Sequence, residues 1–170
     1  MKKIVAILAV ALIGMSAAFS AKAIEDPNPK GTLVVGAQVG VMPLGTNVFG
    51  DYVLVDSWWK GHFTVGGQVG LSTFGYGWGR YTYFDIAPRV TYGLNITNQF
   101  EVHVGVLSGI GFTMDRFESG DHYEVHNDFR LVYGGVTGVR FFFSDKFGAT
   151  AEIIGAGHYS TFNAGIVMKF

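Results

Sequence analysis

The chain has 170 residues, of which 12 are Lys or Arg, 13 are Asp or Glu and none is Cys. The absence of Cys excludes disulfides, a lipid-anchored N-terminal cysteine, thiolate metal sites and a cysteine nucleophile. The balanced charge indicates no basic surface for a nucleic-acid partner.

The first residues have the pattern of a secretory signal peptide. Lys2 and Lys3 precede an apolar run over 4–18, and small residues at 21–23 flank a cleavage site. An uncleaved anchor is disfavoured because a spanning helix needs roughly 20 apolar residues. We therefore expect three parts, which are a signal peptide removed after export to the periplasm (1–23), a short periplasmic segment (24–30) and one domain (31–170).

Seven segments of that domain alternate between apolar and polar or small residues with a period of two, which is typical of half-buried strands. An eighth segment, 50–57, alternates poorly and is included because bacterial up-and-down barrels have an even number of strands. Pro88 predicts a local irregularity, because proline cannot donate a ladder hydrogen bond. The seven clear segments are 31–41, 62–73, 81–94, 100–114, 129–143, 147–157 and 161–170.

The connections between these segments alternate in length, as they do in an up-and-down barrel. Three short turns are predicted at the periplasmic end, and four loops at the opposite, extracellular end. The turns are 57–60, 95–99 and 144–146, and the loops are 42–49, 74–80, 115–128 and 157–160. The sequence therefore predicts an all-β fold, an eight-stranded antiparallel up-and-down transmembrane β-barrel.

Alternation alone also fits a soluble barrel with an apolar interior, but three features favour lipid outside. The polar face is rich in glycine, whereas a water-facing surface carries roughly 25–35% charged residues. Aromatic residues gather at both ends of the strands, as in the two girdles of a membrane barrel. Finally, a tilted run of about ten residues is long enough to span the hydrocarbon core.

With this orientation, the polar face lines a narrow lumen. Unpaired charges there are very costly, so acids and arginines are expected to pair and fill the interior. An open channel is disfavoured because wide lumens belong to barrels with many more strands, although a narrow small-solute pore stays an alternative. The predicted lumen network is Asp85, Arg89, Glu101, His103, Arg130, Arg140 and Glu152.

The whole domain, together with its signal peptide, resembles the small OmpA/OmpX-type outer-membrane barrels. Its composition, rich in glycine and aromatic residues, is also similar to that of the porin-family barrels of Bacteroidota. The resemblance implies an integral outer-membrane location and a C-terminal signal that the barrel-assembly machinery reads. The matching residues on the last alternating strand are Phe162, Ile166, Met168 and Phe170.

Two motifs suggest chemistry. His122, Glu124 and His126 would share one face of a strand and could bind a divalent metal, but acidic, histidine-bearing surface loops are common and no metal is predicted. His158 and Ser160 faintly resemble the His-x-Ser motif of lipid A deacylases, which act by nucleophilic attack. No acid follows Ser160, so a lipid A ester hydrolase is only the alternative function.

The favoured function is non-enzymatic and needs no cofactor. Function in such folds lies in exposed loops rather than in the scaffold. We therefore expect a structural or surface-interaction protein, with outer-membrane lipid as its surroundings and any extracellular ligand bound through loop 115–128.

Overall fold

A computed structural model describes residues 27–41, 44–59, 61–76, 79–119, 122–156 and 159–170. The predicted signal peptide, 1–23, lies outside these residues and stays a prediction. No helix in the described part of the chain is long and apolar enough to cross a membrane.

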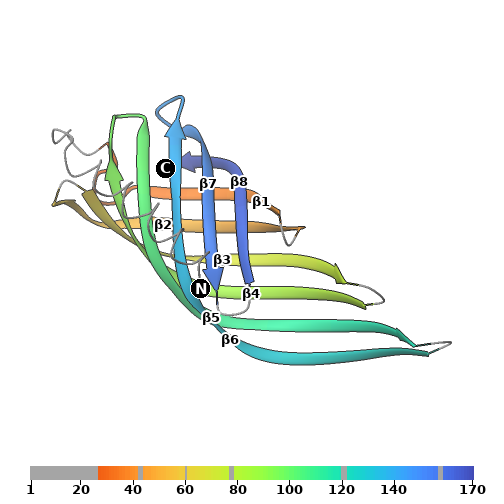
Figure 1. Cartoon of the computed structure of the whole chain (residues 1–170). Coiled ribbons are helices and arrows are strands. Elements are labelled where there is room, and N and C mark those ends of the chain that lie inside the picture. The colour runs from red at the N-terminus through yellow and green to blue at the C-terminus, as the bar shows by residue number, and fades with distance from the viewer. Residues whose placement is uncertain (1–26, 42–43, 60, 77–78, 120–121, 157–158) are drawn as a thin grey trace, which may run out of the picture.

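Eight antiparallel strands form a closed barrel in which each strand pairs with its neighbours in the chain and β1 pairs with β8 (Figure 1). The predicted all-β, eight-stranded fold is therefore confirmed. The strands are β1 (Leu33–Val41), β2 (Leu44–Trp58), β3 (Gly61–Tyr76), β4 (Gly79–Asn95), β5 (Phe100–Ser119), β6 (His122–Phe142), β7 (Phe147–Ala156) and β8 (Tyr159–Lys169).

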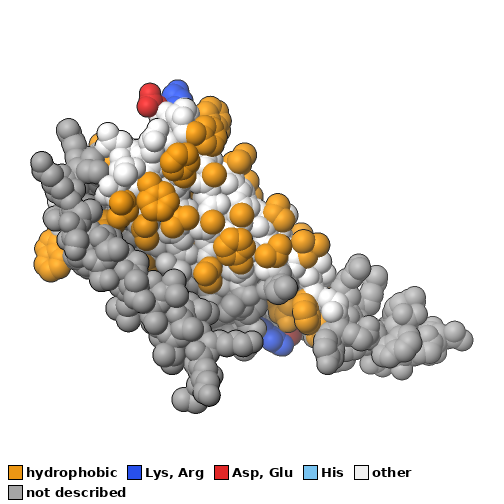
Figure 2. Space-filling view, turned by 45° about the horizontal axis from the view of Figure 1, so that its top comes forward, with side chains coloured by type: hydrophobic (Ala, Val, Ile, Leu, Met, Phe, Trp, Pro, Cys, Tyr) orange, Lys and Arg blue, Asp and Glu red, His pale blue; other side chains and the backbone are white. Residues whose placement is uncertain are grey.

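The two faces of each strand are those that the alternation predicts. Along β5, Val104 and Val106 are exposed on the outside, whereas Glu101 and His103 are buried inside. Among the strand residues whose side-chain burial the structure describes, no outward-facing one is charged. Figure 2 shows apolar side chains scattered over the wall, with charged ones only toward the ends. Such an outer surface suits hydrocarbon rather than water.

Strand β2 differs most from the prediction. The segment expected to be a loop, 42–49, is mostly strand, because β2 begins at Leu44 and runs the full height of the wall. Its pairing with β3 shifts register between Val53 and Val55. This bulge adds a residue to β2, so Val53 is buried while Leu54 and Val55 are both exposed. The bulge explains why the sequence does not alternate here.

The loops predicted at 74–80 and 115–128 are also largely strand. β5 continues to Ser119 and β6 starts at His122, with Asp115 paired to His126 along the way. Pairing gives each backbone N–H and C=O a partner that an irregular loop would lack. The resulting β5–β6 hairpin reaches well beyond β7 and β8 (Figure 1).

The far part of β6 has one open edge. Its pairing with β7 starts only at Gly134, so among the described residues the stretch 122–133 pairs with β5 alone. The strands β3 to β6 thus rise above the short side of the barrel formed by β7, β8 and β1.

Pro88 produces the predicted irregularity. The pairing of β4 with β5 is continuous up to Ile86 and resumes at Arg89, with a gap at the two residues between. Pro88 remains paired with Gly67 on the other side. Because proline has no N–H, the gap falls on the side where a donor is missing.

Candidate functional site

The barrel lumen contains a cluster of buried charges at the level of the ladder that joins β2, β3 and β4. Arg89 donates from Nε to Asp51 Oδ1 at 2.7 Å and from Nη2 to Asp51 Oδ2 at 2.5 Å. Both side chains are fully buried. This is a two-point guanidinium–carboxylate pair, the strongest geometry available to these groups.

Arg140 on β6 joins the same carboxylate from the other side. Its Nη2 donates to Asp51 Oδ2 at 2.5 Å, and its Nη1 donates to Glu101 Oε1 at 3.0 Å. Asp51 therefore lies between two guanidinium groups. Their positive charges offset the cost of removing this carboxylate from water.

Glu152 on β7 completes the cluster. It accepts hydrogen bonds from Arg89 Nη1 at 3.2 Å and Nη2 at 3.1 Å, and its Oε1 lies 2.9 Å from His103 Nε2. Because an ionised carboxylate only accepts, His103 Nε2 carries the proton in this bond. We call these residues the lumen ion cluster, namely Asp51, Arg89, Glu101, His103, Arg140 and Glu152.

Glycines on the intervening strands allow these side chains to meet. Gly66 lies in register between Asp51 and Arg89, and a Cβ there would collide with the backbone oxygen of Gly50 and with the Asp51 carboxylate. Gly138 lies in the same way between His103 and Glu152. Because these inward-facing glycines have no side chain, charged residues on the two flanking strands can contact each other across them.

An aromatic ring forms one wall of the cluster. Phe49 is buried inside the lumen, with the Arg89 guanidinium carbon 4.1 Å and the Arg140 guanidinium carbon 5.3 Å from its ring centroid. Stacking on the ring adds a cation–π attraction to the two ion pairs. Gly36 makes room for this ring, because a Cβ there would collide with it.

The segment before β1 closes the cluster on the side of the short turns. Asn28 is fully buried and its Nδ2 donates to Glu101 Oε2 at 2.8 Å and lies 3.4 Å from Asn95 Oδ1. His62 lies nearby, with Nε2 3.7 Å from Glu101 Oε2. Part of the segment predicted as a periplasmic N-terminal tail, 24–30, therefore lies inside the barrel mouth.

Five of the seven predicted network residues meet in this cluster and two do not. Arg89, Glu101, His103, Arg140 and Glu152 are brought together. Asp85 and Arg130 are separate from it. Arg130 lies at the rim, 36% exposed, and pairs with Asp128 at 2.9 Å. Asp85 is buried, and its carboxylate accepts from Gln68 Nε2 at 3.5 Å.

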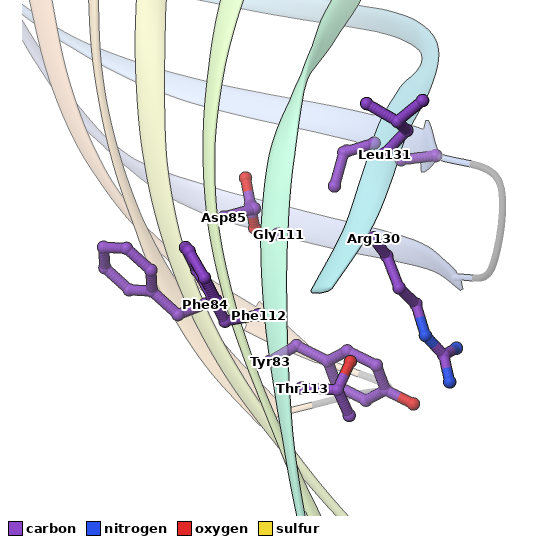
Figure 3. Close-up of a pocket in the computed structure, with 10 residues that line it drawn as sticks. Tyr83, Phe84, Asp85, Gly111, Phe112, Thr113, Arg130 and Leu131 are labelled. Atoms are coloured by element: carbon purple, nitrogen blue, oxygen red, sulfur yellow. The ribbon is translucent and has the colours of Figure 1, made fainter. Parts of the chain in front are cut away.

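Asp85 and Arg130 line opposite parts of one pocket, together with Tyr83, Gly111 and Thr113. In Figure 3 the Arg130 side chain extends away from Asp85 instead of toward it. Gly111 is in register with both Asp85 and Arg130, so the direction of the Arg130 side chain, and not its height in the barrel, separates the two charges.

Sequence reasoning missed Asp51, Asn28 and His62. Asp51 lies on the strand whose start was placed too late, so its inward position could not be assigned. A usable signal existed in the alternation of Asn47, Phe49, Asp51 and Val53, all four of which are buried.

The other predicted residues are placed as follows. Phe162, Ile166 and Phe170 point outward and are exposed, with Met168 partly so. Phe170 closes the barrel, because its N donates to Leu33 O at 2.9 Å and its O accepts from Leu33 N at 3.1 Å. The role of these residues as an assembly signal stays a prediction.

The two chemical motifs fall outside what the structure describes. This applies to the side chains of His122, Glu124 and His126 and to the pair His158 and Ser160. Within the described residues, no group of three or more His, Asp or Glu side chains could hold a metal ion. The metal and hydrolase hypotheses are therefore untested.

No family model and no curated protein matches the sequence. The fold is similar to solved bacterial outer-membrane barrels. Ail, the attachment invasion locus protein of Yersinia pestis, aligns with a TM-score of 0.59 and 17% identity over 82% of this chain and 97% of Ail.

Two further barrels give similar values. Neisserial surface protein A aligns with a TM-score of 0.58 and 10% identity over 82% of this chain and 94% of that chain. The N-terminal barrel domain of Pseudomonas aeruginosa OprF aligns with a TM-score of 0.52 and 13% identity over 83% of this chain and 98% of that chain. At such identities the likeness concerns the fold, which is that of a small eight-stranded outer-membrane β-barrel.

Proposed function

We propose that this chain is an integral, non-enzymatic outer-membrane barrel that acts through its projecting β5–β6 hairpin, with its lumen closed. The observation that carries the closed lumen is the lumen ion cluster. It draws side chains from β2, β4, β5, β6 and β7, and its four acid and arginine pairs are 2.5–3.2 Å long. A solute would have to break buried ion pairs, each costing about 3–5 kcal/mol, to pass.

The hairpin supports the surface role. It extends past β7 and β8 (Figure 1), and within the described part of the chain β6 pairs along 122–133 with β5 alone. An unpaired strand edge offers a row of backbone donors and acceptors to a partner. Nothing on the short side of the barrel offers a surface of this kind among the described residues.

The charge of the hairpin favours a cationic partner. The stretch 115–128 contains five Asp or Glu residues, one Arg and two His. Ail has been crystallised with the heparin analogue sucrose octasulfate, which is strongly anionic. The acidic hairpin of this chain would repel such a ligand, so we infer that its partner is a basic surface.

Tag insertion tests the location of the hairpin. An epitope inserted between 120 and 121 should react with antibody on intact cells. The matched control has the same epitope at Asp145 in the β6–β7 turn and should react only after the outer membrane is permeabilised. Equal reactivity of the two tags on intact cells contradicts the proposed orientation.

Planar-bilayer recording tests the closed lumen. The purified barrel should give no conductance steps. The double variant Glu101→Ala, Arg140→Ala removes two paired side chains from the lumen and should conduct, which shows that the assay detects an opened barrel. Regular steps from the unmodified protein would establish the narrow-pore alternative instead.

Binding to charged beads tests the partner class. Vesicles containing the barrel should adhere to polylysine beads and not to heparin beads, and adhesion should weaken as salt screens the charges. The variant Asp115→Asn, Glu118→Gln, Glu124→Gln should adhere less. Preferential adhesion to heparin would show that the inferred partner class is wrong.

A further inference from the structure

Above the lumen ion cluster the barrel contains a second polar space, which we call the outer chamber. It is partly open to solvent, and the space within it that a water molecule can occupy is about 20 Å³. The lining side chains with polar ends come from four strands, β2, β3, β4 and β8. They are Asn47, Gln68, Ser72, Asp85, Thr161 and Asn163.

Three amides in the outer chamber are buried without a full set of hydrogen bonds. Asn47 is 5%, Gln68 3% and Asn163 3% exposed. Among the described residues, Asn47 Oδ1, Gln68 Oε1 and Asn163 Nδ2 have no hydrogen-bond partner. Burying such an atom without a partner costs about 1–3 kcal/mol. Three such atoms in one cavity indicate that something else satisfies them.

These unpartnered atoms suit a cation. Asn47 and Gln68 contribute oxygens, and Asp85 adds a carboxylate to the same cavity. A half-turn of the Asn163 amide exchanges the positions of its nitrogen and its oxygen at almost unchanged shape. The set then consists of three amide oxygens and one carboxylate, which are the ligands that Ca²⁺ takes in proteins.

Two glycines give these groups their space. A Cβ on Gly70 would collide with the Asp85 carboxylate, and a Cβ on Gly40 would lie against Asn163 Oδ1 and Thr161 Oγ1. As in the ion cluster, each polar head therefore occupies room that a neighbouring strand leaves empty.

We propose that the outer chamber binds a hard, oxygen-preferring cation of the Ca²⁺ class between Asp85 and the amides of Asn47, Gln68 and Asn163. The chamber reaches Gly45 and Ser72, close to the ends of β2 and β3 that face the outside, so the cation enters from the extracellular side. With a single carboxylate, binding falls in the weak range, with a Kd of about 10⁻⁴–10⁻³ M.

Thermal unfolding in detergent with CaCl₂, at ionic strength held constant with NaCl, tests the site. Ca²⁺ should raise the midpoint of the unmodified barrel, because a ligand that binds only the folded state stabilises it. Gln68→Met should lower the Ca²⁺ affinity about tenfold or more, as the loss of one buried bond to a charged group predicts.

Gln38→Met is the matched control. Gln38 is also a buried glutamine, 3% exposed, with an unpartnered Oε1, but it does not line the chamber. The unfolding midpoint of Gln38→Met should still rise with Ca²⁺, whereas that of Asp85→Asn should not. Heat-modifiability on a gel identifies the variants that fold.

Two results overturn the proposal. One is an unmodified barrel whose midpoint does not respond to Ca²⁺. The other is a response of equal size in all variants, which would place binding elsewhere, such as on the acidic hairpin. Isothermal titration with Ca²⁺ gives the affinities directly and must rank Gln68→Met below Gln38→Met.

Discussion

Arg89 and Asp51 meet across the strand that lies between them, with Arg89 Nε and Nη2 2.7 Å and 2.5 Å from the two carboxylate oxygens. Gly66 on β3 is in register with both. The pair exists because a strand without a side chain at that point separates β2 from β4. The stability of the barrel therefore depends on a charge pair and a glycine together.

Removing the charge of Asp51 should destabilise the barrel strongly. Asp51→Asn leaves Arg89 and Arg140 without a shared carboxylate in a fully buried position. We expect a loss of about 3–5 kcal/mol in the free energy of unfolding, measured by urea unfolding in lipid vesicles. The control Asp128→Asn breaks the exposed pair with Arg130 and should cost about 1 kcal/mol or less.

Adding one methyl group to β3 should have opposite effects at adjacent positions. Gly66→Ala forces a Cβ against the Gly50 backbone and should cost about 1–3 kcal/mol, as overpacking does. Gly67→Ala faces outward, with its nearest contact at 3.7 Å, and should be neutral or stabilise by up to about 1 kcal/mol. Equal effects in the same unfolding assay would contradict the role given to Gly66.

The Tyr92 hydroxyl should stabilise the β2–β3 turn. Tyr92 donates to Trp59 O at 2.8 Å and lies 3.2 Å from Trp58 O, and Trp59 has a positive φ of 49°, which non-glycine residues rarely adopt. Tyr92→Phe should cost about 0.5–1.5 kcal/mol. Tyr133→Phe, whose side chain is 64% exposed, should leave the unfolding midpoint unchanged.

A negative charge at Asn28 should open the end of the barrel that the N-terminal segment closes. Asn28→Asp replaces a donor to Glu101 with a second carboxylate, and like charges at this distance repel each other in a buried site. We expect faster proteolysis of the N-terminal segment and a lower unfolding midpoint. Asn98→Asp in the exposed β4–β5 turn adds the same charge and should change neither.

The faces of the strands could be predicted from the sequence because a period of two fixes which side chains share a side. This is why Glu101, His103, Arg140 and Glu152 were placed inside. The heights of side chains in the lumen could not be predicted, since they depend on register between strands. Asp85 and Arg130 were grouped with the cluster for that reason.

Strand ends were harder to predict than strand faces. The bulge at Val53 and Val55 disturbs alternation in β2, which hid the strand that carries Asp51 and Phe49. In the stretch 115–128, acidic residues suggested a solvated loop, although paired strands are equally compatible with water. Asn28 precedes all alternation, so no periodic signal could locate it.

The lumen ion cluster takes its members from five of the eight strands, and the last residue, Phe170, bonds to Leu33 at the start of the first strand. A half-built sheet that entered the bilayer would therefore present bare carboxylates and guanidinium groups to lipid tails. Entry into the membrane and joining of the two ends must then occur as one event. The interior charges therefore oppose membrane insertion of any form of the chain whose barrel is not yet closed.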